Sequence, residues 1–400
     1  MESRAFAPTS LAGLKLRNRI IKTATFEGMT PDGIPTDALI RHHRDLAAGG
    51  VGMTTVAYCG VTDAAKTFPD QMHMHEGIRP QLERLAEAVH KEGGALSAQL
   101  AHCGTFTRNR QSPRRPLGPS FTLNEYGLMN GRPFGYAMDE DDIRRTIDEY
   151  GAAAAFARSV GFDAVEIHMG HGYLLSQFIS PLANRRRDAW GGSLENRMRL
   201  PLAVLQRIRE TVGEDYPVLA KFNLDDGVPG GLHIEDSIAA VRMLEAGGLN
   251  AVVMSGGYTA KAPLYLLRGG RPLREMIAVD PNPLQRFFLR LLGAYYLRRY
   301  PFENLFFLDL ARQMRRAVQM PLVYLGGCTS LQDLDTCMVE GFDFVAMGRA
   351  LIADPEWVHK VRDSGHAYKT VCNACNKCIT AMDTPGGTRC VLFEEDFLKK

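Results

Sequence analysis

Eight short runs rich in β-branched residues recur along the chain, and most are followed by a stretch with helical periodicity. The runs begin near residues 19–23, 51–56, 95–99, 164–167, 218–222, 251–255, 322–325 and 344–347. Between them apolar side chains return every three or four residues, as in Leu82, Leu85 and Val89, which is the spacing of one helix face. Strands that alternate with helices form a parallel sheet. Eight such units predict an α/β fold, a closed (β/α)8 TIM barrel rather than an open doubly wound sheet.

Two segments are too long to be plain barrel loops. Residues 104–138 carry four Pro and several Arg, and we expect a lid or hairpin over the barrel mouth. Residues 258–302 contain a basic, aromatic stretch at 285–292, which predicts a surface helix or a subunit contact ahead of a membrane-surface role. We therefore expect one barrel domain over residues 1–365, with these two mouth insertions, and a Cys-rich tail over residues 366–400.

The composition excludes several classes of partner. The 400 residues carry a formal net charge of +2, which offers no basic field for nucleic acid. No apolar stretch approaches the ~20 residues that span a bilayer, and the first residues lack the apolar core of a secretory signal. We expect a cytoplasmic protein without a membrane span, whose partner is a small molecule or, in a homo-oligomer, another copy of the chain.

Two imidazoles and a phenol lie within six residues after the fourth run. His168, His171 and Tyr173 leave a strand expected to end near Ile167, and the carboxyl ends of strands carry the chemistry of α/β barrels. Imidazoles supply hydrogen bonds or protons near neutral pH, and a phenol is an acid weak enough to protonate an enolate-like carbon. The same spacing is also typical of half a metal site, or of histidines that only satisfy local hydrogen bonds.

Glycines after the seventh and eighth runs predict a phosphate site. Gly326 and Gly327 let the backbone approach a ligand closely, and Gly348 and Arg349 add a cation that can bind phosphate oxygens with two nitrogens. In a barrel the last two strands commonly end in such a site. A plain turn is the alternative interpretation of the Gly-Gly pair.

Gln99 is expected to end the third strand and Lys221 to lie in the fifth, and both should point at the same mouth. A side-chain amide pairs with the donor and acceptor edge of a heterocycle, and a nearby ammonium stabilises negative charge on a reduced ring. Taken singly, each residue could cap a strand or extend to solvent. Together with the phosphate site they predict bound flavin mononucleotide. No Gly-x-Gly-x-x-Gly string occurs, which argues against a resident dinucleotide-binding domain.

These residues lie in strings that resemble the Old Yellow Enzyme, or NADH:flavin oxidoreductase, family of FMN-dependent barrels. The matching strings are LKLRNRI at residues 14–20, QLAHCG at 99–104, GFDAVEIH at 161–168, YLLSQF at 173–178, DAWGGSLENR at 188–197 and GR at 348–349. The resemblance implies that His168 and His171 bind a substrate carbonyl and that Tyr173 donates a proton to the α-carbon. It also implies that Gln99 and Lys221 bind the flavin ring.

The first strand departs from the family pattern. Relatives often place Thr or Cys beside the flavin there, whereas this chain has Thr25 followed by Phe26 and Glu27. Thr25, or the backbone around it, is therefore the expected flavin contact. Lys221 stands where many relatives have Arg, so the charge is kept and the forked geometry is lost.

Four cysteines crowd the tail. Cys372, Cys375, Cys378 and Cys390 supply four thiolates, which can hold a [4Fe-4S] cluster or zinc, or remain free thiols. The spacing resembles that of the 2,4-dienoyl-CoA reductase branch, with one residue fewer between the second and third Cys. In that branch the cluster receives electrons from a second, FAD-bearing domain, and here the sequence stops at Lys400, so we expect no internal electron source.

The sequence predicts an FMN-dependent NAD(P)H oxidoreductase of the ene-reductase type. It would reduce the C=C bond of an α,β-unsaturated carbonyl compound such as an enone or enoate, with both substrates using one pocket in turn. Two alternatives stay open. One is an iron-sulfur-containing enoate or dienoyl reductase or dehydrogenase fed by a separate partner. The other is a metal-dependent barrel lyase or hydrolase with His168 and His171 as ligands.

Overall fold

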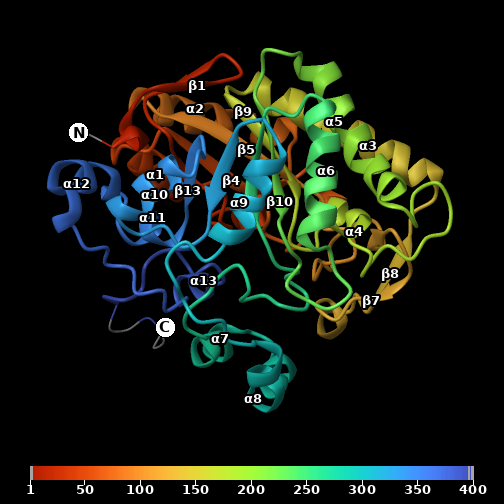
Figure 1. Cartoon of the computed structure of the whole chain (residues 1–400). Helices are drawn as coiled ribbons and strands as arrows, with labels where there is room; N and C mark the ends of the chain where they lie inside the picture. The colour runs from red at the N-terminus through yellow and green to blue at the C-terminus, as the bar shows by residue number, and fades with distance from the viewer. Residues whose placement is uncertain (1–2, 395–396, 398–400) are drawn as a thin grey trace.

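Eight parallel strands close into a barrel in the computed structural model, which describes residues 3–394 and 397. The strands are β3 (Ile20–Lys22), β4 (Met53–Gly60), β5 (Ala95–Ala101), β9 (Ala164–Met169), β10 (Val218–Asn223), β11 (Ala251–Ser255), β12 (Leu322–Leu325) and β13 (Phe344–Met347). Each pairs with the next in this order, and β13 pairs with β3 to close the sheet. The predicted (β/α)8 barrel is confirmed, since each of the eight runs forms a strand of it (Figure 1).

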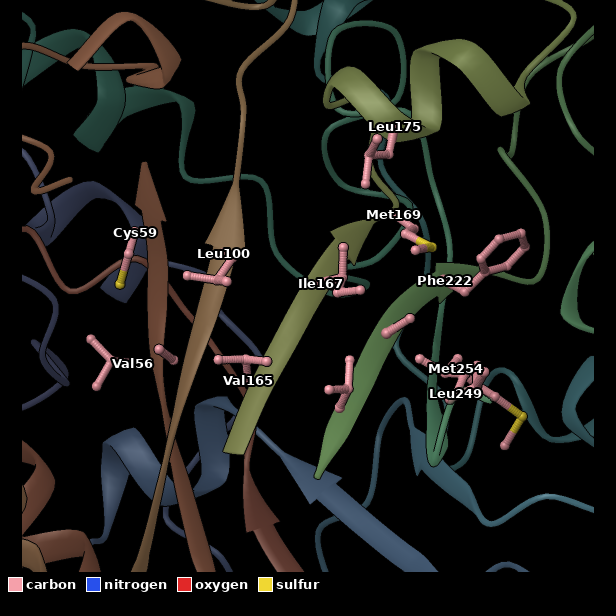
Figure 2. Packing of buried hydrophobic residues seen from close by; sticks show 14 of the residues in the cluster. Val56, Cys59, Leu100, Val165, Ile167, Met169, Leu175, Phe222, Leu249 and Met254 are labelled. Carbon is pink, nitrogen blue, oxygen red and sulfur yellow. The ribbon is translucent and has the colours of Figure 1, made fainter. Parts of the chain in front are cut away.

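Helices surround the barrel (Figure 1). The α-helices that the structure describes are α1 (Asp37–Ala48), α2 (Arg79–Lys91), α3 (Glu140–Ser159), α4 (Leu174–Ile179), α5 (Leu194–Val212), α6 (Ile234–Ala246), α7 (Leu273–Val279), α8 (Pro283–Tyr296), α9 (Leu308–Ala317), α10 (Leu331–Val339), α11 (Arg349–Ala353), α12 (Trp357–Ser364) and α13 (Cys378–Ala381). Helix α2 buries the predicted face of Leu82, Leu85 and Val89. Figure 2 shows the matching layer on the strands, where side chains such as Val165, Ile167 and Phe222 belong to the large core cluster.

Alternation along the strands fills the barrel interior in layers, because successive side chains of a strand point to opposite faces. The lower layer is apolar. It contains Ile21, Met53, Ala95, Ala164, Leu219, Ala251, Val253, Val323, Phe344 and Ala346. Leu11 and Leu16 join it from the hairpin of β1 (Thr9–Leu11) and β2 (Leu14–Leu16). The same alternation continues to polar residues nearer the carboxyl ends, so Gln99, Glu166 and Lys221 face inward.

Both mouth insertions carry structure of their own. The first holds the small sheet of β6 (Leu117–Gly118), β7 (Thr122–Leu123) and β8 (Phe134–Ala137). The second holds α7 and α8, which stand apart from the barrel in Figure 1. Helix α8 contains the basic, aromatic stretch for which a surface helix is expected. No helix among residues 3–394 is both long and apolar enough to cross a membrane.

The tail packs on the segment that leaves β3. Thr388 donates its backbone N–H to Glu27 O at 2.6 Å and its hydroxyl to Phe26 O at 2.7 Å. Gly28 has a φ of +64°, and a Cβ there would lie 2.2 Å from Met382 O. Only glycine combines that conformation with that approach. The tail therefore forms part of the barrel mouth.

Candidate active site

The predicted His-His-Tyr motif lies where β9 leaves the barrel. The strand continues to Met169 rather than ending near Ile167, because β10 pairs with it as far as Phe222. His168 is therefore the last inward-facing residue of β9. His171 follows in the turn with a φ of +62°, and Tyr173 lies directly before α4.

Neighbouring strands hold His171 in its left-handed conformation. Its backbone N–H donates to Asn223 Oδ1 at 3.1 Å, and its carbonyl accepts from Thr259 N at 3.0 Å. Its ring Nε2 lies 2.8 Å from Ser255 Oγ. A non-glycine residue with positive φ costs free energy and persists where its surroundings fix it, which is common at functional sites.

The structure brings the three side chains together. The rings of His168 and His171 meet edge to face with centroids 5.0 Å apart, and the centroids of His168 and Tyr173 are 4.5 Å apart. Gly170 N donates to His168 Nδ1 at 3.4 Å, which places the proton of the neutral ring on Nε2. The motif thus presents two hydrogen-bond groups and a phenol on one small surface.

Burial sets the protonation of this surface. It lowers the pKa of His168 well below the usual value and that of His171 to about 3, and Lys221 acts in the same direction on both. Burial also raises the pKa of Tyr173 to about 12, although the hydroxyls of Tyr58 and Thr67 oppose the shift. At neutral pH the imidazoles are uncharged donors and the phenol keeps its proton.

We expect stability to fall as the pH drops below 6.5. Burial lowers the pKa of both His171 and His102 to about 3. Between pH 6.5 and about 3 these imidazoles are protonated in the unfolded chain and neutral in the folded protein. The free energy of unfolding therefore falls as the pH drops from 6.5 towards 3. Each histidine costs about 1.4 kcal/mol per pH unit in that window. Urea unfolding at stepped pH measures the slope. His102→Gln should reduce this slope by the contribution of one histidine. An unchanged slope would contradict the conclusion that His102 is buried in its neutral form.

Tyr58 joins the motif without having been predicted. It lies on β4, where the register shifts between Val56 and Cys59, and its ring centroid is 5.2 Å from that of Tyr173 and 6.2 Å from that of His168. The phenols of Tyr58 and Tyr173 interact, and burial raises the pKa of Tyr58 well above its usual value. The irregularity in β4 leaves no signal in the apolar pattern that could have identified this residue.

Gln99 and Lys221 meet at a third residue, Glu166. Lys221 Nζ lies 3.0 Å from Glu166 Oε1, and Gln99 Nε2 donates to the same oxygen at 2.6 Å. All three side chains are buried. Gln99 was expected to end its strand, but β5 runs on to Ala101. The sequence analysis did not assign Glu166 to the site. It lies two residues before His168 on the same strand and so points to the same face, and this spacing is the signal that could have identified it.

We expect Glu166→Gln to destabilise the protein strongly. The change leaves the ammonium of Lys221 buried without a counter-charge, which costs about 3–5 kcal/mol. Urea unfolding measures the loss. Glu87→Gln, which breaks the exposed pair with Lys91, is the matched control and should barely change the midpoint. Equal midpoints for the two variants would show that the buried pair contributes no more than a surface pair.

The ends of β12 and β13 form an open backbone cradle. Gly326 and Gly327 have φ values of +143° and +78°, and a Cβ on Gly327 would lie 2.7 Å from Glu303 O. The amides of Gly326, Gly327 and Gly348 donate to no acceptor among the residues that the structure describes. The buried hydroxyl of Thr23 likewise has no hydrogen-bond partner among the residues that the structure describes. Unpaired amides at adjacent strand ends fit a phosphate.

Flavin mononucleotide fits this mouth by the chemistry of its groups. The cradle offers backbone donors for a phosphate, and the Gln99, Glu166 and Lys221 cluster offers an amide and an ammonium for a heterocycle. Thr25 Oγ1 lies 3.7 Å from the position of a Cβ on Gly348, so it borders the cradle. Arg349 is turned towards the tail, where its Nη1 donates to Arg268 O at 2.8 Å and to the Asn376 side chain.

The tail cysteines lie beside Arg349. Burial raises the pKa of Cys378 to about 12, Arg349 opposes the shift, and Cys372, Cys375 and Cys390 add to it. The other three cysteines thus all lie close enough to Cys378 to affect its charge, and all four are free thiols. Within residues 3–394, no three His, Cys, Asp or Glu side chains adopt a metal-holding arrangement. Four cysteine sulfurs are suitable ligands for a metal, but their arrangement in this structure is not that of a metal site.

A cavity of about 1110 Å³ lies near the motif, although His168, His171 and Tyr173 are not among its lining residues. Phe26 and Phe68 line it, and the ring centroid of Phe26 is 5.2 Å from that of Tyr58. Arg108 also lines it, with its guanidinium 4.7 Å from the Phe68 ring and paired with Asp383 of the tail at 2.7 Å. Its volume is close to the upper end for a small-molecule site. The ring of Tyr58 packs against both Phe26 and Phe68 of the cavity wall and against Tyr173.

Comparison with known families agrees with these features. A model described as the NADH:flavin oxidoreductase / NADH oxidase family matches residues 4–262. The chain is 40% identical to a 4,4'-dithiodibutanoate disulfide reductase of Rhodococcus erythropolis, over 97% of this chain and 94% of that protein. It is 32% identical to a metal reductase of Desulforamulus reducens over 93% of this chain, and spans only 50% of that longer protein.

A solved structure reproduces the fold. The structure of 2-naphthoyl-CoA reductase superimposes with a TM-score of 0.82 over 99% of this chain and 57% of that one. The sequence identity is 22%, so the likeness concerns the fold alone. The sequence relatives, rather than this structure, carry the likeness in chemistry.

Proposed function

The chain belongs to the NADH:flavin oxidoreductase / NADH oxidase family, the Old Yellow Enzyme family, and is thus an NAD(P)H-dependent flavin oxidoreductase, and we propose that it reduces activated C=C bonds. The proposed acceptor is an α,β-unsaturated carbonyl compound. The observation that carries the proposal is the neutral pair His168 and His171 packed against the protonated phenol of Tyr173. That surface can bind a carbonyl oxygen and protonate the neighbouring carbon.

His168 and His171 would hold the carbonyl oxygen of the acceptor. As hydride reaches the β-carbon, negative charge gathers on this oxygen, and two neutral donors stabilise it without a change in their own protonation. Tyr173 would then give its proton to the α-carbon, and a raised pKa keeps that proton available over a wide pH range. One C=C bond is lost and two C–H bonds form.

Thr25, Gln99, Lys221, Gly326, Gly327 and Gly348 would hold FMN. Arg349 would join them at the phosphate by leaving its hydrogen bonds to Arg268 O and Asn376. When bound, FMN takes hydride from NAD(P)H and supplies it to the acceptor. Lys221 would face the ring with its positive charge, and Gln99 would turn its amide to the ring edge. Glu166 fixes both side chains before any ligand arrives. This arrangement limits the reorganisation that binding requires.

An absorbance spectrum of the anaerobically purified protein is the first test. Bound flavin should give a structured band that bleaches with NAD(P)H and recovers when an enone is added. A protein that stays colourless after incubation with FMN would contradict the cofactor proposal. A flavin that bleaches but does not recover with any enone or enoate would leave the family assignment intact and overturn the acceptor proposal.

Reduction of an organic disulfide is the second candidate activity. The relative that is 40% identical over nearly its whole length is named as a disulfide reductase. Two electrons and two protons convert one disulfide into two thiols, and no carbon atom is protonated. Recovery of the reduced flavin with 4,4'-dithiodibutanoate but with no enone would favour this activity.

The cysteine tail leaves three proposals for Cys372, Cys375, Cys378 and Cys390. A [4Fe-4S] cluster would suit a reductase fed by a separate electron-transfer partner, whereas zinc or free thiols would leave the flavin chemistry self-contained. A broad iron-sulfur shoulder in the spectrum, or zinc found by elemental analysis, decides among them. No step proposed for His168, His171 or Tyr173 passes through this group. Because the chain belongs to a flavin oxidoreductase family, the alternative of a metal-dependent lyase or hydrolase is not proposed further.

Location and assembly stay predictions. A cytoplasmic location is checked by cell fractionation, and a homo-oligomer by light scattering of the purified protein.

A further inference from the structure

Helix α8 presents an apolar face to solvent. Its exposed apolar side chains are Leu284, Phe287, Phe288, Leu291, Leu292, Tyr295 and Tyr296, each between 38% and 82% exposed. A contiguous set of this kind on a surface marks an interaction site rather than chance exposure. In Figure 1 the helix lies at the outer edge of the molecule, beyond α7 and away from the barrel.

The exposed arc is broad. At 100° per residue, these seven positions cover roughly half of the helix circumference, about twice the ~100° stripe that a helix usually buries. Gly293 is the buried residue of α8, and a Cβ there would lie 2.6 Å from Leu273 Cδ1 of α7. The helix thus contacts α7 through the narrow strip around Gly293. A single partner helix packed on the exposed side would cover only a narrow stripe of the apolar arc.

Within α8 and the six residues after it, every charged side chain is an arginine. Residues 283–302 contain Arg286, Arg290, Arg298 and Arg299 and no Asp or Glu. Arg290, Arg298 and Arg299 are exposed. Arginines on the polar side and aromatic and Leu side chains on the other are typical of helices that lie in the surface of an anionic bilayer.

We propose that α8 seats the barrel mouth on a membrane surface that contains anionic phospholipid. The apolar arc would enter the boundary between headgroups and acyl chains, and the arginines would reach the phosphates. The sequence alone favours a subunit contact, whereas the width of the exposed arc favours a continuous apolar phase. Asn282 and Gln285, at the start of α8, also line the cavity near the active site, so the seated helix adjoins that cavity.

Vesicle co-sedimentation of the full chain tests the proposal. We expect binding to vesicles of equal parts phosphatidylcholine and phosphatidylglycerol, weak binding to phosphatidylcholine alone, and a loss of binding at high salt. Leu291→Ser should lower the affinity about tenfold or more, the loss expected when one buried Leu side chain is removed. Arg290→Gln should lower binding to the mixed vesicles and reduce its dependence on salt.

Val339→Ser is the matched control, because Val339 is 87% exposed at the end of α10 and outside the proposed surface. It should bind as the unchanged protein does. No binding to the mixed vesicles, or equal binding by Leu291→Ser, would overturn the proposal. A lipid-free dimer that Leu291→Ser separates would show that a second copy covers the face, and would overturn it too. The assay contains no nicotinamide and no acceptor, so its outcome is independent of the proposed function.

Discussion

Tyr173→Phe should slow the reduction of an enone by about 10²- to 10⁴-fold, the range for loss of a positioned general acid. The phenyl ring keeps the packing against His168 and Tyr58, so the fold and the cavity wall should persist. Stopped-flow absorbance separates the two half-reactions. Bleaching by NAD(P)H should be unchanged, and only the recovery with the enone should slow.

Tyr58→Phe is the control for this change, since it removes the neighbouring phenol and leaves the proposed donor in place. It should slow recovery far less than Tyr173→Phe. Equal rates of recovery for Tyr173→Phe and the unchanged protein would rule out Tyr173 as the proton donor. With a disulfide as acceptor both variants should recover normally, because the thiolate products need no proton at carbon.

His168→Ala should lower the rate of recovery with an enone by about 10²- to 10³-fold, as expected for loss of one donor to a developing oxyanion. The loss should appear in kcat more than in KM, because the hydrogen bond strengthens as charge gathers on the oxygen. Steady-state kinetics over a range of enone concentrations measure the split.

His171→Asn is the matched variant on the other imidazole. Asn tolerates the left-handed conformation that His171 adopts and keeps a hydrogen-bond donor. It should retain most of the activity, whereas His171→Ala should lose the donor and destabilise the turn as well. A His168→Ala enzyme with unchanged kcat would show that the carbonyl oxygen binds elsewhere.

Local pattern was sufficient for the barrel. The eight runs became its strands, and the face of Leu82, Leu85 and Val89 became the buried side of α2. It was also sufficient to name His168, His171 and Tyr173 as a group, since six residues of chain cannot carry them far apart. The turn at His171 then depends on Asn223 and Ser255 from two other strands, which no local pattern contains.

The chain itself thus determined the periodicity, the strand ends and the chemistry gathered there, because these depend on neighbours a few residues away. Only the tertiary structure decided that Glu166 joins Gln99 to Lys221, that Tyr58 stands beside Tyr173, and that the tail closes on Phe26. It alone showed that α8 keeps its apolar face in solvent. Contacts between distant segments, and exposure itself, are set by which faces the other elements cover, and periodicity within one segment carries no information on that.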